Sequence, residues 1–212
     1  MATRSSEVIP RSSLAGLVAV LVMLAGATLW FINHNALRYT SYDAATYGEF
    51  WPRRLGLVPH IFGGMLAALV GLVQLWLGLT GRTGAWHRSL GRVYLAGVVV
   101  GSAGAFYLAL TIDRQYFAYA AGLFGLACAW VVTTSMALYS IRKRALEQHR
   151  EWMLRSYVVT FAFVTFRLVE KLLLPLNITT PMELDTLLAF ACWSVPLLLA
   201  EPLIQLRRMR RR

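Results

Sequence analysis

The sequence predicts an all-α, polytopic membrane protein: a bundle of six transmembrane helices with both termini in the cytoplasm. Of its 212 residues, 58% are hydrophobic and only 15% are charged, whereas about a quarter of the residues are charged in an average soluble domain. The apolar residues form long runs, and a helix needs about 20 apolar residues to cross a bilayer. The 21 Lys and Arg residues outnumber the 10 Asp and Glu residues and lie mostly between those runs, as expected when loops carry the positive charge.

Six apolar segments are long enough to be the spans, and together they occupy most of the chain as a single bundle. The first four contain almost no charged residues. The fifth is interrupted by Arg155, Arg167, Glu170 and Lys171, and the sixth contains Glu201. The predicted spans are residues 14–32, 55–80, 92–112, 116–141, 152–176 and 185–206.

The positions of the basic residues predict the orientation of the bundle. With the N-terminus in the cytoplasm, four of the 21 Lys and Arg residues fall on the outer side, and Arg167 and Lys171 lie deep in the fifth span. The other fifteen are cytoplasmic, counting Arg155 near the start of that span. Cytoplasmic loops carry the excess of Lys and Arg, so this orientation is expected, in a bacterial inner membrane. The basic C-terminus is expected to attract anionic lipid. Its residues are Arg207, Arg208, Arg210, Arg211 and Arg212. No nucleic-acid binding is expected from so apolar a chain.

Small residues predict which helices pack closely. Helices in a bilayer associate through close backbone contact, for which Gly and Ala leave room. The second span places six residues near one line along its surface: His60, Gly64, Ala67, Gly71, Gln74 and Gly78. The third and fourth spans carry repeated Gly and Ala as well, so these three helices are expected to form a tight inner bundle. Since His60 and Gln74 are polar, each must find a partner inside the protein.

The four histidines fall into two pairs. His34 and His60 lie near the outer ends of the first two spans, and His87 and His149 lie near the cytoplasmic starts of the third and fifth. A b-type haem held between helices needs two axial imidazoles at the same depth. The leading interpretation is a haem-binding or other redox membrane protein. Its candidate ligands are His60, His87 and His149, and the haem iron is the only metal expected.

The outer pair is the weaker one, because His34 lies at the edge of a loop. The simpler version of the haem hypothesis is therefore a single haem between His87 and His149. In the alternative interpretation, each histidine forms hydrogen bonds to the backbone or to lipid headgroups.

The two cytoplasmic histidines begin similar motifs, HRSLGRVY at residues 87–94 and HREWMLRSY at residues 149–157. A helix N-terminus carries partial positive charge and free N–H groups, which favour anions. The arginines of both motifs predict a site for a phosphate, a carboxylate or haem propionates: Arg88, Arg92, Arg150 and Arg155.

Two alternatives to the haem interpretation stay open. The same arginines without a cofactor would make the protein a carrier or binding protein for a small anion or a lipid headgroup. A non-catalytic accessory subunit of a membrane complex would have no site of its own, and its arginines would only set the topology.

Three charged residues lie past the midpoint of the fifth span. Charges at that depth are costly and usually face a partner or a wet cavity. Arg167 and Glu170 can pair on one helix because they are three residues apart. Lys171 then needs an acidic partner near the outer surface, and the candidates are Asp113, Glu183 and Asp185. A structural ion-pair network and a transport or proton-relay role are both open, and Glu201 has no evident partner.

With these motifs, the chain resembles a family of uncharacterised bacterial multi-pass membrane proteins, one of the domain-of-unknown-function families. The resemblance rests on a small-residue helix running from His60 to Gln74 and on helix starts of the form HRxxGRxY and HRxWMxRSY. It covers roughly residues 57–170. It implies a multi-pass membrane architecture and no reaction, and the chain has no Gly-rich phosphate loop, HExxH or nucleophile elbow. Whether the protein is an enzyme therefore stays open.

Overall fold

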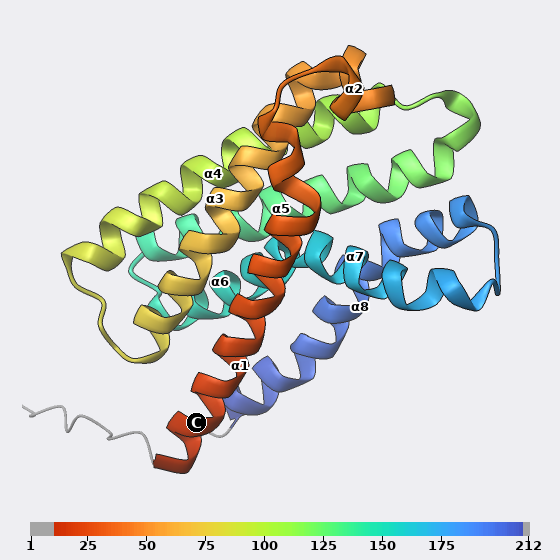
Figure 1. Ribbon diagram of the computed structural model, residues 1–212. Coiled ribbons are helices and arrows are strands. Elements are labelled where there is room, and N and C mark those ends of the chain that lie inside the picture. The colour runs from red at the N-terminus through yellow and green to blue at the C-terminus, as the bar shows by residue number, and fades with distance from the viewer. Residues whose placement is uncertain (1–10, 210–212) are drawn as a thin grey trace, which may run out of the picture.

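The computed structural model describes residues 11–209, and in this part the chain is helical without any strand (Figure 1). A short helix, α2 (Ala44–Tyr47), lies between the first two long helices. Asp43 caps α2. Hydrogen bonds from the amide and hydroxyl of Thr46 hold the pKa of the Asp43 carboxyl below its usual value. The longer helices are α1 (Arg11–Phe31), α3 (Arg54–Leu79), α4 (Ala85–Leu110), α5 (Phe117–Arg142), α6 (Leu146–Thr160), α7 (Ala162–Leu173) and α8 (Pro181–Met209).

Five segments of the described chain, containing α1, α3, α4, α5 and α8, are long and apolar enough to cross a membrane. This confirms the predicted fold class, an all-α membrane protein. α1 begins and α8 ends at one end of the bundle (Figure 1), called here the termini end. α4 and α6 also begin at the termini end, and α2 lies at the opposite end. The cytoplasmic location of the termini stays a prediction.

The predicted fifth span is two helices, α6 and α7, which follow one another from the termini end to the opposite end (Figure 1). The break lies at Phe161, whose ψ of −5° departs from regular helix geometry. Thr160 Oγ1 donates a hydrogen bond to the carbonyl oxygen of Ser156 at 2.8 Å, and such back-bonding bends helices. Because this segment is broken and charged, the number of six spans stays a prediction.

α3 and α4 make the most extensive contact in the molecule, and their backbones touch. A Cβ atom added to Gly63 would lie 2.5 Å from the nitrogen of Gly101 and 2.7 Å from the carbonyl oxygen of Gly97. The close packing predicted for the second and third spans is therefore confirmed. We call this contact the α3–α4 seam, defined by Gly63, Gly97 and Gly101.

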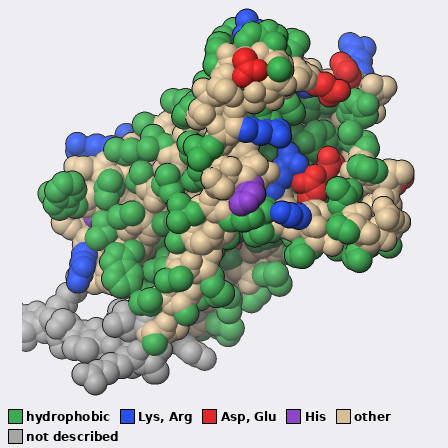
Figure 2. Space-filling view, in the orientation of Figure 1, with side chains coloured by type: hydrophobic (Ala, Val, Ile, Leu, Met, Phe, Trp, Pro, Cys, Tyr) green, Lys and Arg blue, Asp and Glu red, His purple; other side chains and the backbone are tan. Residues whose placement is uncertain are grey.

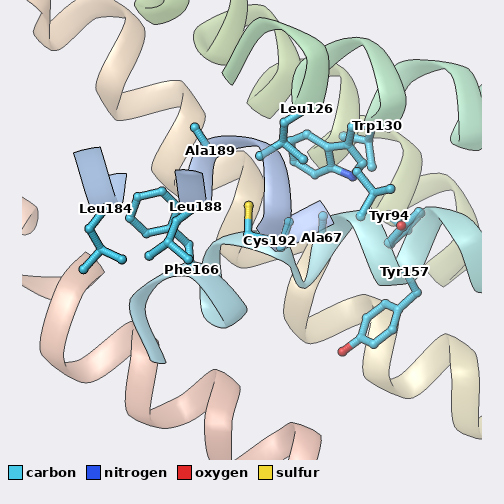
Figure 3. Close-up of a cluster of buried hydrophobic side chains, with 13 residues drawn as sticks. Ala67, Tyr94, Leu126, Trp130, Tyr157, Phe166, Leu184, Leu188, Ala189 and Cys192 are labelled. Atoms are coloured by element: carbon cyan, nitrogen blue, oxygen red, sulfur yellow. The ribbon is translucent and has the colours of Figure 1, made fainter. Parts of the chain in front are cut away.

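The small residues of α5 were expected to join the same inner bundle, but they face α8. A Cβ atom on Gly122 would lie 2.8 Å from the Cβ of Ala189, and one on Gly125 would lie 3.3 Å from the ring of Trp193. α5 instead meets the seam through a large residue, since the Trp130 ring lies against Gly101. Trp130 belongs to a buried cluster with Tyr94, Phe166 and other side chains of α3 to α8 (Figure 3).

Several helices begin before the predicted spans, among them α4 and α8. α4 begins at Ala85, although the third span was predicted from residue 92, because the basic residues of its first turns are compatible with a helix end outside the apolar core. α8 begins at Pro181 because Thr180 and Glu183 form a capping box. Glu183 N donates to Thr180 Oγ1 at 3.4 Å, and Thr180 N donates to Glu183 Oε2 at 3.0 Å.

Substitution of Gly63 by Ala is expected to destabilise the protein, because the added methyl group meets the backbone of α4. Overpacking of this kind costs about 1–3 kcal/mol. Gly64→Ala is the matched control, since a Cβ atom there has nothing within 4 Å. Denaturation by SDS in mixed micelles, followed by circular dichroism, measures both variants. Equal stability of the two variants would contradict the seam.

Candidate functional site

α4 and α6 bring His87 and His149 together at the termini end of the bundle. Gly81, with φ of +74°, turns the chain between α3 and α4, and Arg144, with φ of +59°, precedes α6. The two helices therefore begin at the same end, with a histidine near the start of each. Tyr94 and Ser156, each seven residues farther along its helix, are hydrogen-bonded at 2.8 Å. Since both helices run in the same direction, His87 and His149 lie at the same level of the bundle.

The two rings differ in their hydrogen bonds. Nδ1 of His149 lies 2.9 Å from the carbonyl oxygen of Ala137 in α5. Because a carbonyl oxygen only accepts, Nδ1 carries the proton and donates, and Nε2 keeps its lone pair. Nδ1 of His87 is buried without a hydrogen-bond partner among the described residues. An unpaired buried group costs about 1–3 kcal/mol, so this nitrogen indicates a missing partner.

The packing of α3 on α4 loosens toward His87. A Cβ atom on Gly78 would meet the Cε1 atom of His87 at 3.9 Å, and one on Gly91 would meet the Nε2 atom of Gln74 at 3.7 Å. These contacts are ordinary, whereas the backbones at the seam leave no room for a Cβ. The buried Gln74 has its predicted internal partner, because its Nε2 donates to the carbonyl oxygen of His87 at 2.7 Å. Gln74 thus ties α3 to the first turn of α4 beside the histidine.

The four arginines of the helix starts do not gather around this pair. Arg88 and Arg92 are exposed. Arg150 forms an exposed ion pair with Glu147 on its own helix, at 3.2 Å. Predicted anion binding by these arginines stays a prediction.

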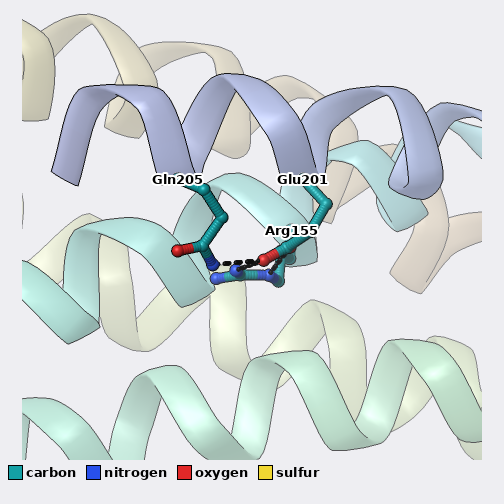
Figure 4. A network of polar contacts seen from close by, with 3 residues as sticks. All are labelled: Arg155, Glu201 and Gln205. Atoms are coloured by element: carbon teal, nitrogen blue, oxygen red, sulfur yellow. Dashed lines mark hydrogen bonds and ion pairs between the residues drawn. The ribbon is translucent and has the colours of Figure 1, made fainter. Parts of the chain in front are cut away.

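Arg155 points to α8, where its guanidinium pairs with the carboxylate of Glu201 at 2.7 Å (Figure 4). The expectation that Glu201 has no partner was wrong. Gln205 Nε2 also donates to Glu201, at 2.7 Å (Figure 4), and the Arg155 guanidinium lies over the ring of Trp152, 4.8 Å from its centroid. This cluster attaches α6 to α8.

His60 lies farther along α3, where the helices are close. Its Nδ1 donates to the carbonyl oxygen of Gly101 at 3.0 Å, and its ring meets Phe163 of α7 edge to face. A Cβ atom on Gly104 would lie 2.7 Å from the backbone nitrogen of His60, so a flat ring system does not fit between the helices there. His34 bonds to the carbonyl oxygen of Trp30 at 2.9 Å. Both histidines therefore bond to the backbone, as in the alternative interpretation.

The charged residues of α7 follow the prediction in part. Arg167 Nη1 pairs with Glu170 Oε2 at 2.7 Å, as expected. The acidic partner expected for Lys171 was wrong, since no Lys171 ion pair occurs among residues 11–209. Its ammonium instead lies over the ring of Trp30, 5.2 Å from the centroid. Of the expected acids, Glu183 is engaged in capping α8.

A buried hydroxyl network joins α4, α5 and α6, and only its α6 members had a sequence signal, as a polar stripe four residues apart. The hydroxyl of Tyr94 lies 2.8 Å from Ser156 Oγ and 2.7 Å from Thr160 Oγ1. Trp130 Nε1 donates to Thr160 Oγ1 at 2.8 Å, and Thr134 Oγ1 lies 2.7 Å from Ser156 Oγ.

The directions of these bonds follow from one donor. Thr160 gives its proton to the carbonyl oxygen of Ser156, so Thr160 accepts from Tyr94. Tyr94 then accepts from Ser156, which accepts from Thr134. Each hydroxyl donates once and the network leaves no proton of these groups unpaired.

Replacement of Tyr94 by Phe is expected to lower the free energy of unfolding by about 1–3 kcal/mol, because the hydroxyl of Ser156 loses its acceptor in a buried position. Tyr157→Phe is the control, since its hydroxyl makes a long bond of 3.5 Å to the carbonyl oxygen of Ala68. SDS denaturation measures the free energy of unfolding of the two variants. A Tyr94→Phe variant as stable as the Tyr157→Phe variant would show that the network contributes nothing.

Comparison with known proteins covers the same helices. A family model described as "Predicted membrane protein (DUF2306)" matches residues 57–204, which is more than half of the chain. These residues include the histidine pair, the seam, the hydroxyl network and the Arg155–Glu201 pair. No curated protein and no solved structure matches the chain. The chain therefore belongs to the DUF2306 family of predicted membrane proteins, a family of unknown function.

Proposed function

We propose that this integral membrane protein is an electron carrier that holds one b-type haem between His87 and His149. The observation that carries the proposal is the buried, unpaired Nδ1 of His87 at the same level of the bundle as a second imidazole, since Tyr94 and Ser156, seven residues beyond the two histidines, are hydrogen-bonded. The two residues come from the starts of different helices at the same end of the bundle. Two imidazoles at one depth are the axial ligands that a haem between helices requires.

The number of ligands favours haem over a bare metal ion. Residues 11–209 contain no group of three or more His, Cys, Asp or Glu that could hold a metal ion. A zinc site takes three or four protein ligands. A haem iron takes its other four ligands from the porphyrin, so one histidine pair is enough.

The neighbours of the pair also suit this role. Metal-binding histidines commonly donate their second ring N–H to a backbone carbonyl, which fixes the ring and leaves the other nitrogen as ligand. His149 has this arrangement with Ala137. Gln74 holds the backbone of His87, and the small residue Gly78 lies beside its ring. A bound haem would supply one-electron transfer.

Binding of a small anion or lipid headgroup at this end is less well supported. It would need several arginines facing one place, whereas Arg150 and Arg155 are paired with different acids. An accessory subunit would bind no ligand here, and this is one outcome of the test below.

The test is the absorption spectrum of the full chain, purified in detergent from cells supplied with a haem precursor. The reduced-minus-oxidised difference is expected to show the α-band of a low-spin b-type haem. His87→Ala and His149→Ala are each expected to remove that band, because each takes away one axial ligand.

His60→Ala and His34→Ala are the matched controls, and both variants are expected to keep the band. His60 lies where the α3 and α4 backbones are in contact, and His34 lies beyond the end of α1, so neither is near the pair. Gel filtration checks that every variant is folded. Protein that stays colourless after reconstitution with haem, or a band that survives His87→Ala, would overturn the proposal.

A further inference from the structure

A group of aromatic and basic side chains lies between α1 and α7 at the opposite end of the bundle from the histidine pair. The rings of Trp30 and His34 stack with centroids 5.3 Å apart. The ammonium of Lys171 lies 5.2 Å from the centroid of the Trp30 ring. Arg167 is four residues before Lys171, so both lie on one face of α7. Figure 2 shows Lys and Arg side chains beside a His over α1 and α7, with acidic side chains next to them.

Within this group, Lys171 is the basic side chain without a carboxylate partner among the described residues. Glu170 neutralises Arg167 through the 2.7 Å pair. Lys171 has no carboxylate within 4.0 Å among the described residues. A Trp ring attracts an ammonium through its π-face, but it brings no counter-charge. The Lys171 ammonium therefore stays available to pair with an anion from outside the chain.

The residue types of the group and their positions at helix ends suit the depth of lipid headgroups. Lys171 is in the last turn of α7, and Trp30 is in the last turn of α1, which continues into a π-helical turn, Ile32–Ala36, that holds His34. Trp is enriched where the hydrocarbon meets the headgroups, and Lys side chains extend toward that level. α1 is the least buried of the apolar helices, so the group opens toward lipid.

From these observations we infer that Trp30, His34, Arg167 and Lys171 form a binding site for the phosphate of an anionic phospholipid. Lys171 supplies the charge that pairs with the phosphate, and the guanidinium of Arg167, held by Glu170, adds hydrogen-bond donors beside it. The Trp30 ring packs along the glycerol and upper acyl chain. The site is independent of the proposed haem, because its residues lie at the other end of the bundle.

A net negative lipid fits better than a zwitterionic one. A zwitterionic headgroup brings its own cation next to Lys171, which weakens the pairing. A free phosphate ion lacks the acyl chains that would lie along the exposed apolar surface of α1, for which burial of each CH₂ is worth about 0.8 kcal/mol.

The experiment compares thermal unfolding of the full chain in detergent with added phosphatidylglycerol, phosphatidylcholine or inorganic phosphate. Phosphatidylglycerol is expected to raise the melting temperature by about 2–4 °C more than phosphatidylcholine. Lys171→Gln is expected to abolish this difference and Lys171→Arg to keep it. Arg114→Gln is the matched control, because it removes one exposed positive charge at the same end and is expected to keep the difference.

Three results would overturn the inference: an undiminished difference in Lys171→Gln, an equal effect of phosphatidylcholine, or an equal effect of inorganic phosphate. If Lys171→Gln fails to fold, quenching of Trp fluorescence by brominated lipids gives a second test. Brominated phosphatidylglycerol is expected to quench the Trp fluorescence of the unaltered protein more than that of Trp30→Phe. With brominated phosphatidylcholine, this difference in quenching between the two proteins is expected to be smaller. An equal difference in quenching for the two lipids would also overturn the inference.

Discussion

The backbone contact between α3 and α4 is the constraint on which the rest of the bundle depends. In a bilayer there is little hydrophobic drive between helices, so van der Waals packing of close backbones must hold them together. At Gly63 and Gly97 the backbones leave no room for a Cβ atom. Farther along the same face, a Cβ on Gly71 would lie 2.5 Å from the Tyr157 ring and 3.1 Å from the Tyr94 ring. The seam therefore fixes where α6 can dock.

The hydroxyl network turns this docking position into a specific register. Tyr94 reaches α6 over the glycine seam, and its hydroxyl is bonded to both Ser156 and Thr160. A polar group buried among helices is costly unless it is paired, so α6 is held at the one rotation that satisfies all of these hydroxyls. His149, on the same helix, is then placed on α5 at Ala137 and close to His87. The proposed haem site thus depends on packing in the middle of the bundle.

Much of the fold could be predicted from the sequence, because composition and small-residue spacing report directly on bilayer crossing and close packing. Local features were also accessible, such as the Arg167–Glu170 pair within one helical turn. Pairs between distant helices were not, because they depend on how each helix is rotated. Arg155 with Glu201 and Lys171 with Trp30 are such pairs. The break at Phe161 had no Pro or Gly to mark it, and it lies next to Thr160, whose hydroxyl is bonded to the carbonyl oxygen of Ser156.

The central claim is that His87 and His149 ligate one haem together, and electron paramagnetic resonance of the oxidised, haem-loaded protein tests it most directly. Two axial imidazoles give a low-spin ferric signal, which is the predicted result for the unaltered chain and for His60→Ala. Loss of either His87 or His149 should convert that signal to high spin, since one axial ligand remains. A high-spin signal in the unaltered protein, or a low-spin signal that survives both substitutions, would contradict the account.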